Sequence, residues 1–201
     1  MNHSVRTARR KQPLLGRFPA WLLLCLIATT GSLAGRADAA DLAIRDVRVS
    51  LDEGVYELDA NLVMTLPDAA QKAIASGLTL KLTYEIVVDR VRRYIPDAEV
   101  AALRQRYEVS YHALSQRYLV RNLNTGEQQD FGSLQGALDR VSELRGLPIL
   151  DTALLAAGPT YEGRIRAVLD LNSAPEVLGW LLFWTDDWSQ ESDWAVWTLR
   201  P

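Results

Sequence analysis

Two neighbouring carboxylates near the carboxyl end of the chain are its best candidates for catalysis. Asp186 and Asp187 lie among tryptophans, and glycosidases use two carboxyl groups about 5–10 Å apart. Aromatic rings beside them could stack on a sugar. Adjacent residues of a strand point to opposite faces, however, and acidic residues are plentiful along this chain. A carboxylate-dependent hydrolase acting on an envelope glycan is therefore the alternative function, ranked below non-catalytic binding.

Five of the six tryptophans cluster between positions 180 and 197. Trp180, Trp184 and Trp188 are spaced by four residues and would form one stripe if Leu178–Trp188 were helical. Three interpretations stay open: a segment that closes the core, an aromatic surface for a ligand or partner, and contact with a membrane interface. The three tryptophans are candidate binding residues.

Arg90, Arg92 and Arg93 form the densest basic cluster after the amino-terminal region. They follow a long predicted strand, where charges are solvated and protect a sheet edge. A phosphate or carboxylate site built with Arg104 and Arg106 is the second interpretation, because guanidinium groups bind such anions with two parallel hydrogen bonds. These three arginines are the second group of candidate binding residues.

Histidine and cysteine are nearly absent from the chain. His112 is the only histidine after His3, and Cys25 is the only cysteine and lies in an amino-terminal apolar run. Zinc sites and Cys–His nucleophile pairs need more such residues than these. Sequence motifs of serine hydrolases, zinc proteases and nucleotide-binding loops are also missing. We expect no metal site, no cofactor and no catalytic residue that the sequence can assign.

Period-two alternation of apolar and polar residues predicts strands along most of the chain after residue 40. The longest clean pattern runs from Leu78 to Asp89 and would extend about 40 Å at ~3.3 Å per residue. The predicted strands are 42–51, 55–64, 78–89, 106–113, 117–123, 147–155, 161–172 and 194–199.

Two short helices are predicted between these strands. One spans Pro67–Ser76, and the other runs from an N-cap at Ser133 to Arg145, with Gly146 as its terminator. Ala98–Gln105 is predicted as a further helical turn. The fold class is therefore α+β, a mainly antiparallel β-sheet or sandwich of seven to eight strands with two short helices.

Residues 1–39 have the three parts of a secretory signal peptide. A basic lead precedes the apolar run Ala20–Ala28, and small residues with an A-x-A site end the segment. The apolar run is shorter than the roughly 20 residues that span a bilayer. We expect Sec-type export to the periplasm with cleavage after Ala39 or Ala40. An uncleaved inner-membrane anchor is the alternative.

Loss of the signal peptide changes the charge of the chain. Residues 1–40 hold six of the 22 basic residues and one of the 25 acidic ones, which leaves a net charge of −8 on the remainder. Nucleic acids require a basic surface, so a nucleic-acid partner is excluded. Residues 40–201 are expected to form a single exported β-rich domain without a transmembrane span.

Several segments occur in an order that is familiar from a known family: Tyr84–Val87, Leu103–Tyr107, Tyr111–Tyr118, Asn122–Gly126, Ser133–Arg145 and Tyr161–Arg166, followed by the tryptophan-rich end. This order resembles an uncharacterised proteobacterial family known only as a domain of unknown function (family 4390). The resemblance implies an exported protein, often encoded beside a sensor kinase of the nitrogen-regulation type, and it assigns no activity or catalytic residue. We expect a non-catalytic binding or accessory protein, linked to an envelope sensor system, that binds an envelope protein or an apolar ligand.

Overall fold

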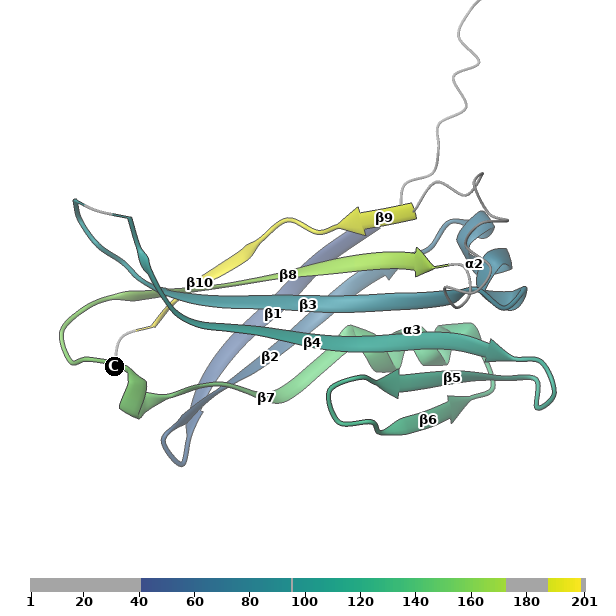
Figure 1. Ribbon diagram of the computed structural model, residues 1–201, viewed down its shortest axis with the longest axis horizontal. Helices are drawn as coiled ribbons and strands as arrows, with labels where there is room; N and C mark the ends of the chain where they lie inside the picture. Colours follow the sequence, from purple (N-terminus) through teal and green to yellow (C-terminus); the bar gives the residue numbers. More distant parts are fainter. Residues whose placement is uncertain (1–40, 95, 173–187, 200–201) are drawn as a thin grey trace, which may run out of the picture. The chain divides into compact units, whose positions relative to one another are not determined.

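A computed structural model of the chain describes residues 41–94, 96–172 and 188–199 (Figure 1). These residues form ten strands, two α-helices and one 3₁₀ turn. Every pair of neighbouring strands is antiparallel. The mainly antiparallel α+β class predicted from the sequence is confirmed.

Three strands form the smaller sheet, sheet A: β1 (Asp41–Asp52), β2 (Val55–Thr65) and β7 (Glu143–Asp151). Strand β2 lies in the middle and pairs with both neighbours. The β1–β2 hairpin turns at Glu53 and Gly54, both with positive φ; this is the geometry of the tight turns that match strand twist. This turn joins the two strands that the alternation predicts at 42–51 and 55–64.

Seven strands form the larger sheet, sheet B: β3 (Thr79–Arg90), β4 (Ala98–His112), β5 (Arg117–Asn122), β6 (Gln128–Phe131), β8 (Tyr161–Asn172), β9 (Trp188–Glu191) and β10 (Ala195–Leu199). The order across the sheet is β10-β8-β3-β4-β5-β6. Strand β8 pairs with β3 along one edge, so β9 and β10 follow one another along its other edge. The carboxyl-terminal strands therefore complete sheet B.

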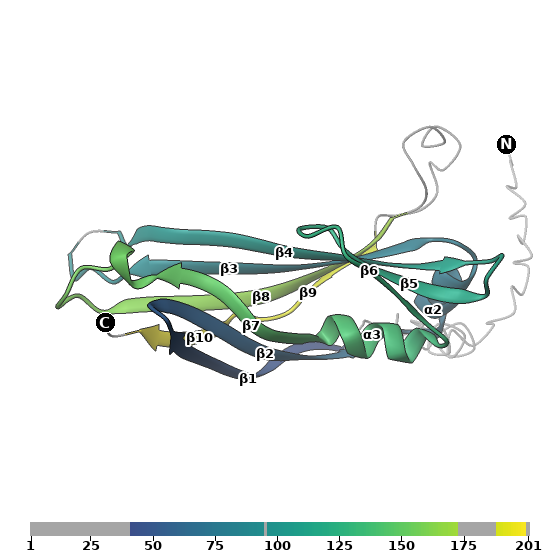
Figure 2. The same cartoon turned by 90° about the horizontal axis from the view of Figure 1, so that it is seen from below.

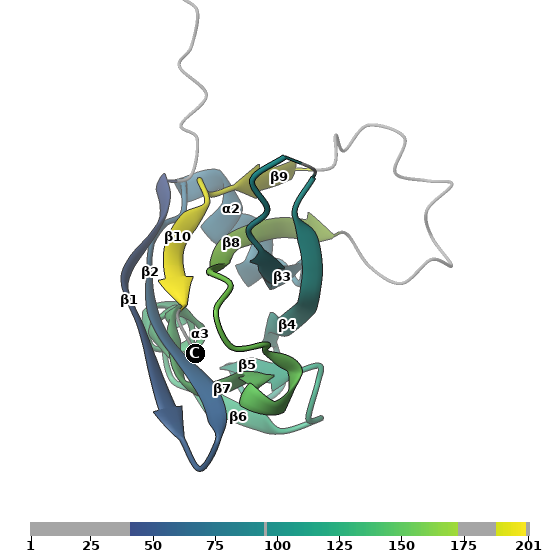
Figure 3. The same ribbon diagram turned by 90° about the vertical axis from the view of Figure 1, so that its left-hand side faces the viewer.

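The hydrophobic core lies between the two sheets, which face each other in the end view of Figure 3. Alternate side chains of β2, β3 and β8 enter it, as period two predicts. Tyr84 is fully buried there and donates a 2.8 Å hydrogen bond to the carbonyl oxygen of Val141. Burial raises the pKa of Tyr84 well above its ordinary value, so this phenol remains a donor.

Both predicted helices are present and cover the core. Helix α2 (Asp68–Ala75) buries Ala70 and Ile74, and Gly77 with positive φ follows it. Helix α3 (Leu134–Ser142) begins at Ser133, whose hydroxyl accepts a 3.2 Å hydrogen bond from the Gly136 N–H. This is the predicted N-cap.

The end of α3 was predicted three residues too late. The helix stops at Ser142, and Glu143 already pairs with Asn61 as the first residue of β7, directly after the helix (Figure 2). Tyr84 takes one of the carbonyl groups that a last helical turn leaves without a helical partner. Gly146 is not a helix terminator; it lies within β7 with φ +56°.

The predicted helical turn at Ala98–Gln105 is wrong. This segment is the first half of β4. It pairs with β3, from Gln105 opposite Tyr84 to Ala98 opposite Arg90. Its alanines favour helix locally, but pairing with a long, buried neighbouring strand overrides that small preference.

Two strands were not predicted. The short strands β6 and β9 carry too few residues to display an alternation, and each is defined by its pairing, with β5 and β8 respectively. They raise the number of strands from the expected seven or eight to ten.

Candidate functional site

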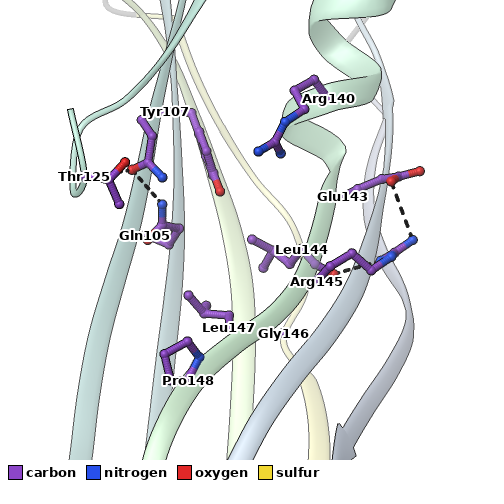
Figure 4. Close-up of a pocket in the computed structure, with 11 residues that line it drawn as sticks. Gln105, Tyr107, Thr125, Arg140, Glu143, Leu144, Arg145, Gly146, Leu147 and Pro148 are labelled. Carbon is purple, nitrogen blue, oxygen red and sulfur yellow. Dashed lines mark hydrogen bonds and ion pairs between the residues drawn. The ribbon is translucent and has the colours of Figure 1, made fainter. Parts of the chain in front are cut away.

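A groove of about 420 Å³ opens between the inner face of sheet B and the α3–β7 segment (Figure 4). Strands β4 and β5 form one wall, and the end of α3 with the first half of β7 forms the other. A volume of this size lies within the ~300–1,000 Å³ typical of ligand sites. The lining residues are Gln105, Tyr107, Asn122, Thr125, Arg140, Glu143, Leu144, Arg145, Gly146, Leu147 and Pro148.

The sheet B wall is held by a network of amide hydrogen bonds. Gln105 is buried, and its Nε2 donates a 2.9 Å bond to Oδ1 of Asn122. The same oxygen accepts bonds from the backbone N–H groups of Asn124 (2.9 Å) and Thr125 (3.3 Å). These bonds fix the turn after β5, and with it the mouth of the groove.

Tyr107 separates the groove from the core. Its ring is buried and packs edge-on against Tyr84, with centroids 6.4 Å apart. Leu144 is buried on the opposite wall, and Leu147 and Pro148 continue the apolar surface along β7. The groove thus has an apolar floor beside polar donors.

Arg140 supplies the positive charge of the groove. Its Nε donates a 3.3 Å bond to Oε1 of Gln129, and Nε2 of Gln129 donates a 2.7 Å bond to Glu127. The guanidinium group points into the groove on the side where Tyr107 lies (Figure 4). Within the described ranges no carboxylate lies within 4.0 Å of it. Arg140 is therefore oriented by a neutral amide and left without a direct counter-charge.

Residues Glu143 to Gly146 form the outer rim of the groove. Arg145 donates hydrogen bonds to the carbonyl oxygens of Ala60 (3.2 Å) and Leu144 (2.8 Å) and to Oδ1 of Asn61 (2.7 Å). Its Nη2 also lies 3.9 Å from Oε2 of Glu143. Because Arg145 is tied to sheet A by several bonds, the rim is fixed relative to β2.

The outer face of sheet B carries a separate charged cluster, which has its charges paired. Glu85 lies between Arg104 (3.1 Å) and Arg166 (2.7 Å), and Arg166 also pairs with Glu191 of β9. The hydrogen bond from Arg166 is the main cause that lowers the pKa of Glu85, and the charges of both arginines lower it further. Unlike Arg140, these groups already neutralise one another.

The tryptophans predicted as binding residues are described only in part. Trp180 and Trp184 lie outside the described residues, as do Asp186 and Asp187 of the hydrolase alternative. Trp188 is the first residue of strand β9, so a helical stripe does not extend through it.

The last two tryptophans of the cluster have distinct surroundings. Trp194 is 38% exposed, and the guanidinium groups of Arg164 and Arg166 stack over its ring at 5.4 and 4.8 Å. Trp197 is partly buried against the core, next to Gly163. These two residues attach the carboxyl-terminal strands to sheet B.

The predicted arginine cluster lies at the β3–β4 connection. Arg90 is half-buried, whereas Arg92 and Arg93 are exposed. Arg104 and Arg106 lie on β4 about 20 Å or more from Ala98, the pairing partner of Arg90, at ~3.3 Å per residue. The structure therefore does not bring Arg104 and Arg106 together with Arg90, Arg92 and Arg93. That these three arginines bind a ligand by themselves stays a prediction.

Sequence reasoning did not single out the groove residues. Tyr107 lies in the predicted strand 106–113, but its position in the groove wall depends on where β7 lies. Arg140 lies three residues after the buried Ala137, at the border of the apolar stripe of α3, and that position is the signal that could have identified it.

Three further features belong to the described part of the chain. His112 is exposed, and its Nδ1 lies 2.9 Å from the Ser115 hydroxyl in the β4–β5 turn. Within the described ranges, no three His, Cys, Asp or Glu side chains gather into a metal-binding group. No helix there is long and apolar enough to cross a membrane.

Comparison with known proteins gives one match. A family model described as "Domain of unknown function (DUF4390)" matches residues 39–198. No curated protein and no solved structure matches the chain significantly.

Proposed function

Since the chain belongs to the DUF4390 family, whose function is unknown, we propose from the groove geometry that it is an exported, non-catalytic module that binds a segment of an envelope protein. The main support for this proposal is the position and orientation of Arg140 in the groove. An arginine that Gln129 orients, with no carboxylate within 4.0 Å among the described residues, keeps donors directed at whatever enters the groove. A carboxylate is the group that best matches a guanidinium fork.

The rest of the groove suits a short peptide segment. The apolar floor of Leu144, Leu147 and Pro148 can cover an aliphatic side chain, while Arg140 and the amides of Gln105 and Asn122 offer polar contacts. Few convergent polar groups beside an apolar surface are typical of binding sites. An envelope sensor system is the partner that the family resemblance suggests.

Photo-crosslinking in intact cells tests this proposal. A photoreactive residue replaces Thr125 in the groove or, as a control, Val63, which is 47% exposed and belongs to sheet A. We expect a crosslinked protein, identified by mass spectrometry, from position 125 and not from position 63. Arg140→Gln should abolish most of that adduct, because losing a charge-assisted hydrogen bond costs about 1.5–3 kcal/mol, roughly a ten- to hundredfold loss in affinity.

Arg121→Gln is the matched control for Arg140→Gln. Arg121 is exposed on β5, outside the groove lining, so its loss changes the net charge equally and should leave the adduct unchanged. Equal crosslinking from both positions, or an adduct indifferent to Arg140, would show that the groove is not the binding site.

A further inference from the structure

Strand β4 is paired along only part of its length on one side. It pairs with β3 from Ala98 to Val109, but with β5 only from Tyr107 to His112. No described strand pairs with the second edge of Ala98–Arg106. This segment is therefore an open edge in the middle of sheet B, beside the groove that Gln105 and Tyr107 line.

The hydrogen-bond directions along this edge follow from its last residues. The N–H of Arg106 donates to Oδ1 of Asn124 (2.9 Å), and the carbonyl of Arg104 accepts from Nδ2 of Asn124 (2.8 Å). These groups point away from β3. Since alternate residues of a strand direct their backbone groups to the same side, the Arg104 N–H and both backbone groups of Ala102 also point to the open edge.

Asn124 occupies the place where a neighbouring strand would continue. Its side-chain amide donates one bond and accepts another from the β4 backbone, as a peptide group of a paired strand does. The next groups along β4, the N–H of Arg104 and both backbone groups of Ala102, have no such partner among the described residues. Asn124 thus makes the first hydrogen bonds along this edge of β4, and the next positions have no partner among the described residues.

Both edges of sheet A carry features that discourage pairing. The β4 segment has one such feature, a register shift at Val100, and it pairs regularly with β3 from Ala101 to Arg106. Strand β7 contains Pro148 and a left-handed Gly146, and β1 contains Asp46 with positive φ at a register shift. Prolines and irregularities of this kind protect edges from added strands. Small and aliphatic residues fill Ala98–Leu103, apart from Glu99, and no proline interrupts it.

We propose that the open edge of β4 accepts one extended segment of the partner protein as an added strand, continuing the line of β5. This inference rests on the proposed binding function and specifies how the segment is held. Only an extended backbone presents N–H and C=O groups at the ~6.8 Å repeat that Ala102 and Arg104 require. The strand would lead from this edge to Gln105 and the groove.

Substitutions at Ala102 test the open edge of β4 without removing a backbone hydrogen bond that the fold uses. Ala102→Pro removes an N–H that points away from β3, so no described backbone bond is lost, whereas the ring and the missing donor block an added strand. Ala102→Val enlarges the exposed side chain but keeps the N–H. We expect both variants to keep the wild-type circular dichroism spectrum and unfolding midpoint.

The probe is an acetylated hexapeptide of alternating threonine and valine with a free terminal carboxylate, added to the purified chain and followed by amide NMR. Binding should shift the Ala102 and Arg104 amides and slow their hydrogen exchange. Ala102→Pro should weaken binding at least tenfold, and Ala102→Val should not. The same peptide with alternate N-methyl groups, which cannot donate to β4, should bind at least tenfold more weakly.

The outcomes separate this inference from the groove function. Binding that depends on Arg140 but is indifferent to Ala102→Pro and to N-methylation overturns strand addition and leaves the groove function standing. Protection of Ala102 and Arg104 by self-association of the chain assigns the edge to a second copy and also overturns the inference. If Ala102→Pro fails to fold, two measurements on the wild-type chain test strand addition instead. These are the affinity for the N-methylated peptide and the hydrogen exchange of the Ala102 and Arg104 amides.

Discussion

Arg140 and Glu85 are both charged, but the surroundings of their side chains differ. Glu85 is enclosed by Arg104 and Arg166, so its charge stabilises the outer face of sheet B. Arg140 is oriented by an amide and faces a groove. The Glu85 charge is paired within the fold, whereas Arg140 has no carboxylate within 4.0 Å among the described residues, so under the proposed function its pairing energy would be gained when a ligand binds.

Glu85 makes folding stability sensitive to acid. Its pKa is lowered from the ordinary 4.5, mainly by the hydrogen bond from Arg166, so the folded chain holds the carboxylate ionised where the unfolded chain would begin to protonate it. The stabilisation is fully present above about pH 4.5 and is lost as the pH falls through the folded pKa. Urea unfolding midpoints should therefore fall more steeply below that pH in the wild type than in Glu85→Gln.

Glu162→Gln is the control for that experiment. Glu162 is exposed on β8 and pairs with no arginine or lysine in the described part of the chain. It should retain the wild-type acid dependence. A Glu85→Gln profile parallel to the wild type would show that the Arg166–Glu85 pair contributes nothing to the pH dependence.

The carboxyl-terminal strands are fastened to β8 by a few specific contacts. Ser192, between β9 and β10, makes two hydrogen bonds of 2.9 Å to the backbone of Ala167. Its N–H donates to the Ala167 carbonyl oxygen, and its hydroxyl oxygen accepts from the Ala167 N–H. Farther along, Trp197 of β10 pairs with Gly163 of β8, and its indole lies directly over the glycine. Gly163 is thus required for close approach rather than for backbone freedom.

Gly163→Ala should destabilise the chain by about 1–3 kcal/mol, because the new Cβ would overlap the Trp197 ring and force it out of place. Combining it with Trp197→Leu should cost less than the sum of the two single changes, since the smaller side chain relieves the overlap. Denaturant unfolding of the four proteins measures this coupling.

Gly132→Ala serves as the control, because the Cβ that it adds would lie 4.0 Å from its nearest described neighbour, a guanidinium nitrogen of Arg117. Its effect should stay within about 0.5 kcal/mol. Equal costs at Gly132 and Gly163, or strict additivity with Trp197→Leu, would contradict the close approach of β10 to β8.

Charge and export concern the molecule as a whole. With residues 1–40 removed, the chain is acidic and has no cysteine, so neither disulfides nor thiol chemistry can contribute in an oxidising compartment. Stability must then come from the core between the sheets and from the pairing of strands. The proposed binding function also requires the chain to reach the envelope.

Expression of the full chain in a Gram-negative host should yield a periplasmic protein that lacks residues 1–39 or 1–40. Intact mass and amino-terminal peptide mapping measure this directly. A substitution of Ala37 by Leu should block cleavage after Ala39, because signal peptidase requires small residues at the A-x-A positions. Recovery of a membrane-bound, full-length wild-type chain would establish the anchor alternative instead.

Most of the longer strands, and the faces that they bury, could be predicted from the sequence, whereas β6, β9 and the first half of β4 could not. Period two in 55–64 and 78–89, and the N-cap at Ser133, are local consequences of side-chain geometry, and the structure confirms them. Helix propensity misled at Ala98–Gln105, because the preference of a few alanines is weaker than pairing with β3.

Which strand edges stay unpaired, and which distant side chains come together, depends on tertiary packing. Arg140, Gln105 and Pro148 come from separate elements, and their shared groove arises when β7 pairs with β2 and so faces β4. The open edge of β4 likewise exists because β5 ends at Asn122 and Asn124 takes over its hydrogen bonds. Alternation in a sequence reports whether a residue faces inward, but not which distant strand it will face, since pairing is set by contacts far apart along the chain.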